Sequence, residues 1–122
     1  MNIEQLRNYC IAKKGVTESF PFDKTTLVFK VMNKMFLLTG LNSWENEDGK
    51  MNVKCDPEKA IELREQYESV QPGFHMNKKH WNTVHLSSGE ISDDLAREFI
   101  DHSYNLIVKS LPKKLKEELQ NL

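Results

Sequence analysis

The sequence predicts a single α+β domain in which helices pack on an antiparallel sheet. Residues 27–55 contain three short apolar runs separated by polar turns, which is typical of a three-stranded meander. Three other segments have apolar residues at helical spacing, so the predicted order is α-β-β-β-α-β-α. A chain of 122 residues buries one hydrophobic core but not two, and we expect residues 1–122 to form one domain.

The first helix is predicted from Asn2 to Lys14. Gly15 follows two lysines, and cations on the last carbonyls followed by glycine are a common helix end. Residues 17–22 are aromatic and contain Pro21, which suits an edge strand or the approach to one.

The meander is predicted from three runs: Leu27–Val31, Met35–Leu41 and Met51–Cys55. Asn33 is the residue of the first connection best able to take a positive φ, so a tight hairpin is expected there. Both faces of the second run are apolar, which places it inside the sheet. Residues 42–49 form a polar loop ending in an Asp-Gly turn.

The second helix is predicted to begin at Asp56-Pro57-Glu58, where an N-cap, a proline in the first turn and an acidic residue coincide. It ends near Tyr67, and Gln71-Pro72-Gly73 breaks the chain before a strand at Trp81–Leu86.

The third helix is expected to be the longest, from Ser92 to Leu111. Its apolar stripe (Leu95, Phe99, Leu106 and Ile107) is expected to face the sheet. Pro112 ends or kinks this helix.

No catalytic constellation is apparent. Asp101-His102-Ser103 has the residue types of a hydrolase triad, but neighbouring helical residues point about 100° apart and cannot converge. The histidines lack metal-ligand spacing, and the glycines form no phosphate-binding loop. We therefore expect no enzymatic activity, no metal and no cofactor.

The charge is balanced, with 17 Lys+Arg against 18 Asp+Glu and a net charge of −1. This balance argues against a strongly basic nucleic-acid-binding protein. No apolar run approaches the ~18 residues of a membrane span, and the first residues lack a signal-peptide profile. With only two cysteines, a cytoplasmic, monomeric protein without membrane contact is expected.

The most distinctive stretch is Gly73 to Thr83, which combines two lysines, two histidines, two aromatics and two asparagines. These side chains can bind phosphates or stack on bases. The residue types alone favour a surface turn in which Phe74 and Trp81 fill the core while the lysines stay solvated. Large aromatics are usually buried, so Trp81 is expected to be mostly buried and structural.

With its surroundings, this stretch resembles the MmcQ/YjbR family over nearly the whole chain. The matching pieces, in order, are Gly15-Val16-Thr17-Glu18, Phe20-Pro21-Phe22, Leu27-Val28-Phe29-Lys30-Val31, Lys34-Met35-Phe36, Lys54-Cys55-Asp56-Pro57, Leu63-Arg64-Glu65, Pro72-Gly73, His75 to Val84, Asp101-His102-Ser103-Tyr104 and Pro112-Lys113-Lys114.

The resemblance implies a small bacterial α+β protein, with a fold related to secretion chaperones and grouped with frataxin-like (CyaY-like) domains. It also implies DNA binding through a double wing, in which two β-hairpins flank a helix. A frataxin-like iron role is disfavoured because the first helix supplies only Glu4 where an acidic ridge is needed.

The chain departs from the family pattern at both expected hairpin tips. Met32-Asn33 stands where many members have glycine-rich residues, and a positive φ at methionine is costly. The loop Glu45-Asn46-Glu47-Asp48 brings three carboxylates near the second tip, where they would repel phosphates.

Two functions follow as hypotheses. The first is weak, backbone-directed DNA binding through a set of basic and polar residues: Lys30, Lys34, Lys50, Lys54, His75, Asn77, Lys78, Lys79 and His80. The alternative is a binding module for a peptide, protein or small ligand, with a groove lined by Trp44, Phe74 and Trp81.

Overall fold

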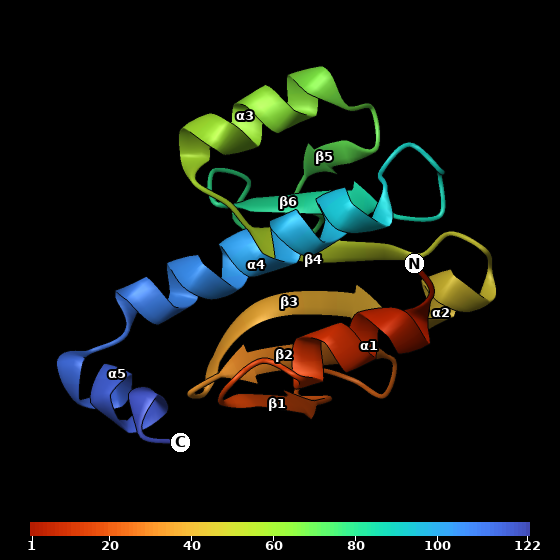
Figure 1. Ribbon diagram of the computed structural model, residues 1–122. Helices are drawn as coiled ribbons and strands as arrows, with labels where there is room; N and C mark the ends of the chain where they lie inside the picture. Colours follow the sequence, from red (N-terminus) through yellow and green to blue (C-terminus); the bar gives the residue numbers. More distant parts are fainter.

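The computed structural model describes residues 1–122 as one six-stranded antiparallel sheet with five helices, in the strand order β1-β2-β3-β4-β6-β5 (Figure 1). The elements, in chain order, are α1 (Ile3–Ile11), β1 (Val16–Ser19), β2 (Thr26–Val31), β3 (Lys34–Gly40), α2 (Leu41–Glu45), β4 (Lys50–Lys54), α3 (Pro57–Gln66), β5 (Val70–Pro72), β6 (Trp81–His85), α4 (Asp93–Ser110) and α5 (Lys113–Gln120).

The long helices lie on one face of the sheet. Figure 1 shows α4 crossing the middle strands and α1 lying beside the β1–β2 side. Between them and the sheet lies the main core, which includes Leu6 of α1, Phe29 of β2, Met51 of β4 and Ile100 of α4. The opposite face, which we call the open face, carries no long helix.

The predicted α+β class and the predicted helices and strands are confirmed, with ends that differ by a few residues at most. The edge strand expected within residues 17–22 forms as β1, and the structure adds a second short edge strand, β5, and two short helices, α2 and α5. The predicted loop at 42–49 begins as α2 because Leu41 and Trp44, one turn apart, both pack on the main core.

Short β5 forms where a simple break was expected. Val70 is buried against the core and pairs with Val84, while Pro72 is tolerated because β5 lies at the sheet edge.

The β2–β3 connection is a two-residue turn with positive φ at both Met32 (48°) and Asn33 (68°). These values are those of a type I′ turn, whose twist matches the flanking strands. Asn33 adopts the conformation predicted for it. The Met32 side chain packs on the main core, which compensates for the unfavourable backbone conformation of a residue that is not glycine.

A β-bulge in β3 is closed by a serine from α4. The register between β2 and β3 shifts after Phe29, so Phe36 is the extra residue. The hydroxyl of Ser103, which is fully buried, donates to the carbonyl of Phe36 (2.5 Å) and accepts from the amide of Lys54 (2.9 Å). Ser103 therefore bridges β3 and β4 next to their last direct pair, Leu37 and Val53.

Ser103 also occupies the centre of the stripe that α4 buries, together with Ala96, Phe99, Ile100 and Ile107. The prediction was right for Phe99 and Ile107, while Leu95 is only partly buried at the margin of the core. It was wrong for Leu106, which stays partly exposed, because the stripe is centred on a polar residue.

The helices of this structure are too short or too polar for any of them to traverse a lipid bilayer.

Candidate functional site

The open face holds a second, smaller apolar cluster made of Val28, Leu38 and Trp81. Trp81 is 8% exposed, which confirms that it is mostly buried. Met76 packs against this cluster. Met76 belongs to the loop that joins β5 to β6, which we call the 73–80 loop.

The 73–80 loop is fastened to the sheet and to α3. The amide of Phe74 donates to the Thr83 hydroxyl (3.0 Å), and the Lys78 ammonium donates to the Gly73 carbonyl (3.0 Å). The guanidinium of Arg64, on α3, donates to the carbonyl of Lys78 and to Asn82 Oδ1. A side chain at Gly73 would place its Cβ 2.8 Å from Trp81 Cβ, so glycine is required there. The loop therefore holds a defined position over the open face.

Beside this loop the open face is hollowed into a groove of about 690 Å³. Its floor comes from the middle strands and its walls from the loops β1–β2 and 73–80; the lining residues are Phe22, Asp23, Thr26, Met35, Leu38, Thr39, Gly40, Ser43, Lys50, Asn52, Phe74, His75, Met76 and Thr83. Phe22 and Phe74 come from the loops at opposite edges of the sheet, and each is 64% exposed. A large groove walled by exposed aromatics is the most developed concave surface of the protein.

Of the three aromatic residues predicted to line a groove, only Phe74 does so. Trp81 packs beneath Met76 and does not line the groove. Trp44 packs on the main core, with its indole N–H donating to Thr39 Oγ1 (2.8 Å). Phe22 was missed, although the apolar run Phe20-Pro21-Phe22 in a turn region was a signal for it.

The polar groups of the groove are ordered by hydrogen bonds. The Thr83 hydroxyl donates to Asn52 Oδ1, so the acceptor end of that amide is occupied. The Asp23 carboxylate accepts from the amides of Thr25 and Thr26 (2.9 and 2.6 Å), and these backbone hydrogen bonds lower the pKa of Asp23. Lys50 pairs with Asp48 at 3.1 Å.

The antiparallel topology gathers lysines at one end of the molecule. The turn after β2, the end of β4 and the start of β6 meet there, and Figure 1 places the ends of α1 and α4, the start of α3 and all of α5 at the same end. We call this the basic end; it carries Lys13, Lys14, Lys30, Lys34, Lys54, Lys59, Lys78, Lys79, Lys109, Lys113, Lys114 and Lys116. The carboxylates at that end are Asp56, Glu58, Asp101, Glu117 and Glu118.

Most remaining carboxylates lie at the opposite end. That end includes the loop with Glu45, Glu47 and Asp48, the end of α3 and the start of α4. The carboxylates expected to repel phosphates are therefore separated by the length of the sheet from the lysines of the β2–β3 turn.

The predicted DNA-binding residues divide accordingly. Lys30, Lys34 and Lys54 lie at the basic end without an ion pair, as do Lys79 and the neighbouring His80. Lys50 and His75 line the groove instead. Lys78 is tied to Gly73, and the side chain of Asn77 accepts from the amide of Lys79 (2.9 Å), so both residues shape the loop.

The residues Asp101, His102 and Ser103 point to three different partners. Asp101 accepts from the Tyr9 hydroxyl (2.6 Å) and from Lys13 (2.5 Å), while Ser103 bridges β3 and β4. His102 Nε2 accepts from the amide of Asp56 (3.2 Å). The three side chains do not converge, as helical geometry predicts.

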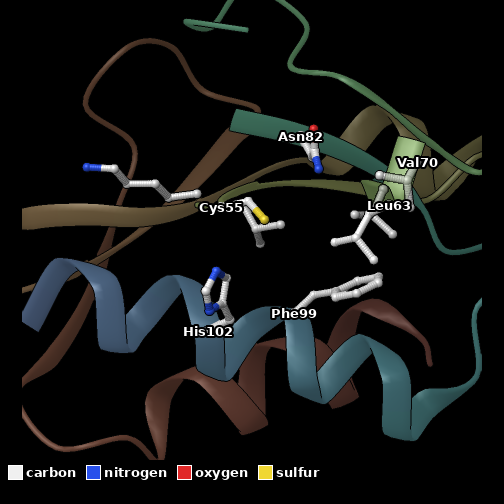
Figure 2. A pocket seen from close by; sticks show the side chains of 9 residues that line it. Cys55, Leu63, Val70, Asn82, Phe99 and His102 are labelled. Atoms are coloured by element: carbon white, nitrogen blue, oxygen red, sulfur yellow. The ribbon is translucent and has the colours of Figure 1, made fainter. Parts of the chain in front are cut away.

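His102 also borders a small pocket between α3, α4 and the sheet, shown in Figure 2 with Cys55, Leu63 and Phe99. Its volume is about 10 Å³, barely enough for one water molecule. Burial raises the pKa of the Cys55 thiol to about 11, so this thiol is protonated and poorly nucleophilic at neutral pH. The pocket is an imperfection of packing rather than a substrate site.

His102 makes stability depend on pH. Burial, and secondarily the ammonium of Lys59, lower its pKa below the ordinary 6.5, in agreement with its role as a hydrogen-bond acceptor. Because the unfolded chain binds the proton first, this contribution is complete above about pH 6.5 and is lost as the pH falls through the lower folded pKa. We expect His102→Gln, which keeps an acceptor, to lose less stability than the wild type between pH 7.5 and pH 5.

Urea unfolding of both proteins at several pH values measures this difference. Equal losses in the two proteins would show that His102 is not the responsible group, since the other histidines are common to both.

These features define a class of small α+β proteins built on one antiparallel sheet with a helix-free face. A family model, YjbR, matches residues 11–106. The uncharacterized Escherichia coli K12 protein YjbR is 34% identical over 122 residues, which is 100% of both chains. The uncharacterized protein YbdF of Escherichia coli O157:H7 is 40% identical over 95 residues, covering 78% of this chain and 75% of that protein.

Solved structures agree. The crystal structure of Deinococcus radiodurans protein DR2400, a DUF419 domain, superposes with a TM-score of 0.87 at 36% identity, covering 98% of this chain and 88% of that one. A Pseudomonas syringae crystal structure gives a TM-score of 0.73 at 25% identity, covering 87% and 98%. The chain belongs to the YjbR family, which confirms the resemblance found in the sequence.

Proposed function

We propose that the protein binds DNA through its basic end. The observation that carries this proposal is the segregation of charge: a chain with a net charge of −1 brings unpaired lysines from several elements to one end of its sheet. Clustered lysines attract the phosphate backbone and release its counterions. The proposed binding is weak, and it depends little on base sequence.

In the double-wing scheme, the β2–β3 turn and the 73–80 loop would be the parts that meet the phosphates. Lys34 lies at the β2–β3 turn and Lys79 lies in the 73–80 loop. Lys30 and Lys54 lie between them. Contact with three or four phosphates predicts a log-log salt slope of about −3 to −4.

The proposed function is non-catalytic. Both thiols are buried with a raised pKa, to about 12 for Cys10 and about 11 for Cys55, and the three polar residues of α4 make structural hydrogen bonds.

A matched pair of single variants tests the role of the basic end. Lys79→Gln and Lys24→Gln each remove one exposed, unpaired lysine, the first at the basic end and the second in the β1–β2 loop at the other. We expect Lys79→Gln to flatten the salt slope for a fluorescent DNA by about one and Lys24→Gln to leave it unchanged. Removing Lys30, Lys34 and Lys79 together should flatten it by about three.

Fluorescence anisotropy from 20 to 200 mM salt measures these slopes. If the triple variant and Lys24→Gln bind DNA equally, the basic end is not the binding surface. If the wild type shows no salt-sensitive binding at low ionic strength, the proposal fails.

A further inference from the structure

We propose that the groove of the open face binds unpaired bases, so that this protein prefers single-stranded nucleic acid to duplex. This inference deepens the proposed function and depends on it. Three observations support it: the aromatic walls of the groove, the polar group in its floor and the lysines around it.

The walls present two aromatic rings to solvent. Phe22 and Phe74 reach the groove from opposite sides, and each keeps 64% of its surface exposed. Apolar rings held on ordered loops at the mouth of a groove are the usual platform on which unpaired bases stack. In a duplex the faces of the bases are covered by their neighbours, so a stacking platform selects single strands.

The loops that carry the rings are held in place before any ligand binds. The amide of Phe74 is bound by Thr83, and the carboxylate of Asp23, next to Phe22, is bound by the amides of Thr25 and Thr26. Because the backbone that carries the rings is already ordered, binding costs less conformational entropy than it would on mobile loops.

The floor offers a directed donor. Asn52 Oδ1 is occupied by the Thr83 hydroxyl, and Nδ2 makes no hydrogen bond within the protein. Since Asn52 lines the groove, this NH₂ group is available to the carbonyl or ring-nitrogen acceptors of a base edge. Thymine, which carries carbonyl oxygens, is a suitable probe.

The charges around the groove suit a backbone that runs along it. Lys30 and Lys54 rise from the open face on the side of the basic end and make no ion pair, whereas Lys50, toward the other end of the groove, is paired with Asp48. Asp23 is the carboxylate in the lining, and four hydrogen bonds donated by Thr25 and Thr26 stabilise its negative charge. A strand whose bases enter the groove thus keeps its phosphates near lysines.

The experiment compares two fluorescent probes: an oligothymidine of about 20 nucleotides, longer than the ~4–16 that one single-strand-binding domain usually covers, and a hairpin duplex with the same number of phosphates. The variants are Phe22→Ala, Phe74→Ala and the control Phe20→Ala, whose ring is 47% exposed and does not line the groove. Binding is followed by anisotropy at low salt, and circular dichroism verifies folding.

We expect the wild type to bind the oligothymidine more tightly than the duplex. Phe22→Ala and Phe74→Ala should each weaken single-strand binding by about fivefold or more and leave duplex binding and the salt slope unchanged. Phe20→Ala should match the wild type for both probes.

The outcomes separate the two proposals. Equal affinity for the two probes, tighter duplex binding or unaffected phenylalanine variants would overturn the single-strand inference while DNA binding stands. The inference would also be overturned if a peptide or small ligand bound in the groove and competed with the duplex but did not compete with the oligothymidine. Failure of both probes to bind would reject the proposed function itself.

Discussion

Replacement of Trp81 by alanine is expected to lower the free energy of unfolding by about 3–5 kcal/mol. Trp81 is 8% exposed and packs against Val28 and Leu38 of the open face. Its removal leaves a cavity that the sheet cannot close, because the strands on either side are fixed by their hydrogen bonds. It also removes the surface on which Met76 lies, so the 73–80 loop should loosen.

Urea unfolding measures the loss, and Phe74→Ala is the matched control. Phe74 is an aromatic residue of the same region but 64% exposed, so its truncation should change stability by less than about 0.5 kcal/mol. A Trp81→Ala protein as stable as this control would show that Trp81 does not stabilise the fold.

Ser103→Ala is expected to lower the free energy of unfolding by about 2–6 kcal/mol, a large effect for the loss of one oxygen atom. The Ser103 hydroxyl satisfies both the carbonyl of Phe36 and the amide of Lys54. Without it, two backbone groups beneath α4 remain unpaired, and each unpaired buried group costs about 1–3 kcal/mol. The contact between β3 and β4 at this point should open before the whole protein unfolds.

Hydrogen exchange of the Lys54 amide reports on this site directly, and exchange there should accelerate more than at other amides of β4. Ser110→Ala is the control, because its hydroxyl donates to the carbonyl of Ile107 at the exposed end of α4 and its loss should be nearly neutral. If Lys54 exchanges at the wild-type rate in Ser103→Ala, the contact between β3 and β4 does not depend on the serine.

Periodicity predicted the long elements because their residues alternate between burial and exposure over several turns or pleats. It did not predict β5, since a strand of three residues owes its existence to its partner β6. The error at Leu106 has a similar origin. The α4 stripe is centred on Ser103, a position decided by the bulge at Phe36, and the bulge leaves no mark in the sequence of α4.

The candidate sites were predictable in part. Lys30, Lys34, Lys54 and Lys79 were recognised as candidates, but their meeting at one end follows from strand order and direction. A groove with Phe74 in its lining was predicted, but its opposite wall with Phe22 could not be derived, because the two walls come from loops far apart in the chain. Trp44 illustrates why residue type alone is not enough. A tryptophan side chain suits a binding surface, yet the indole of Trp44 donates a hydrogen bond to Thr39 beside the core.

The segregation of charge also governs how this protein meets a partner before any contact forms. A molecule with lysines at one end and carboxylates at the other behaves as a dipole, and the field of a polyanion turns it so that the basic end approaches first. Such alignment raises the association rate constant more than the lifetime of the complex. Because the field decays over a Debye length of about 10 Å at 0.1 M salt, the approaching protein turns only during its last nanometre of diffusion.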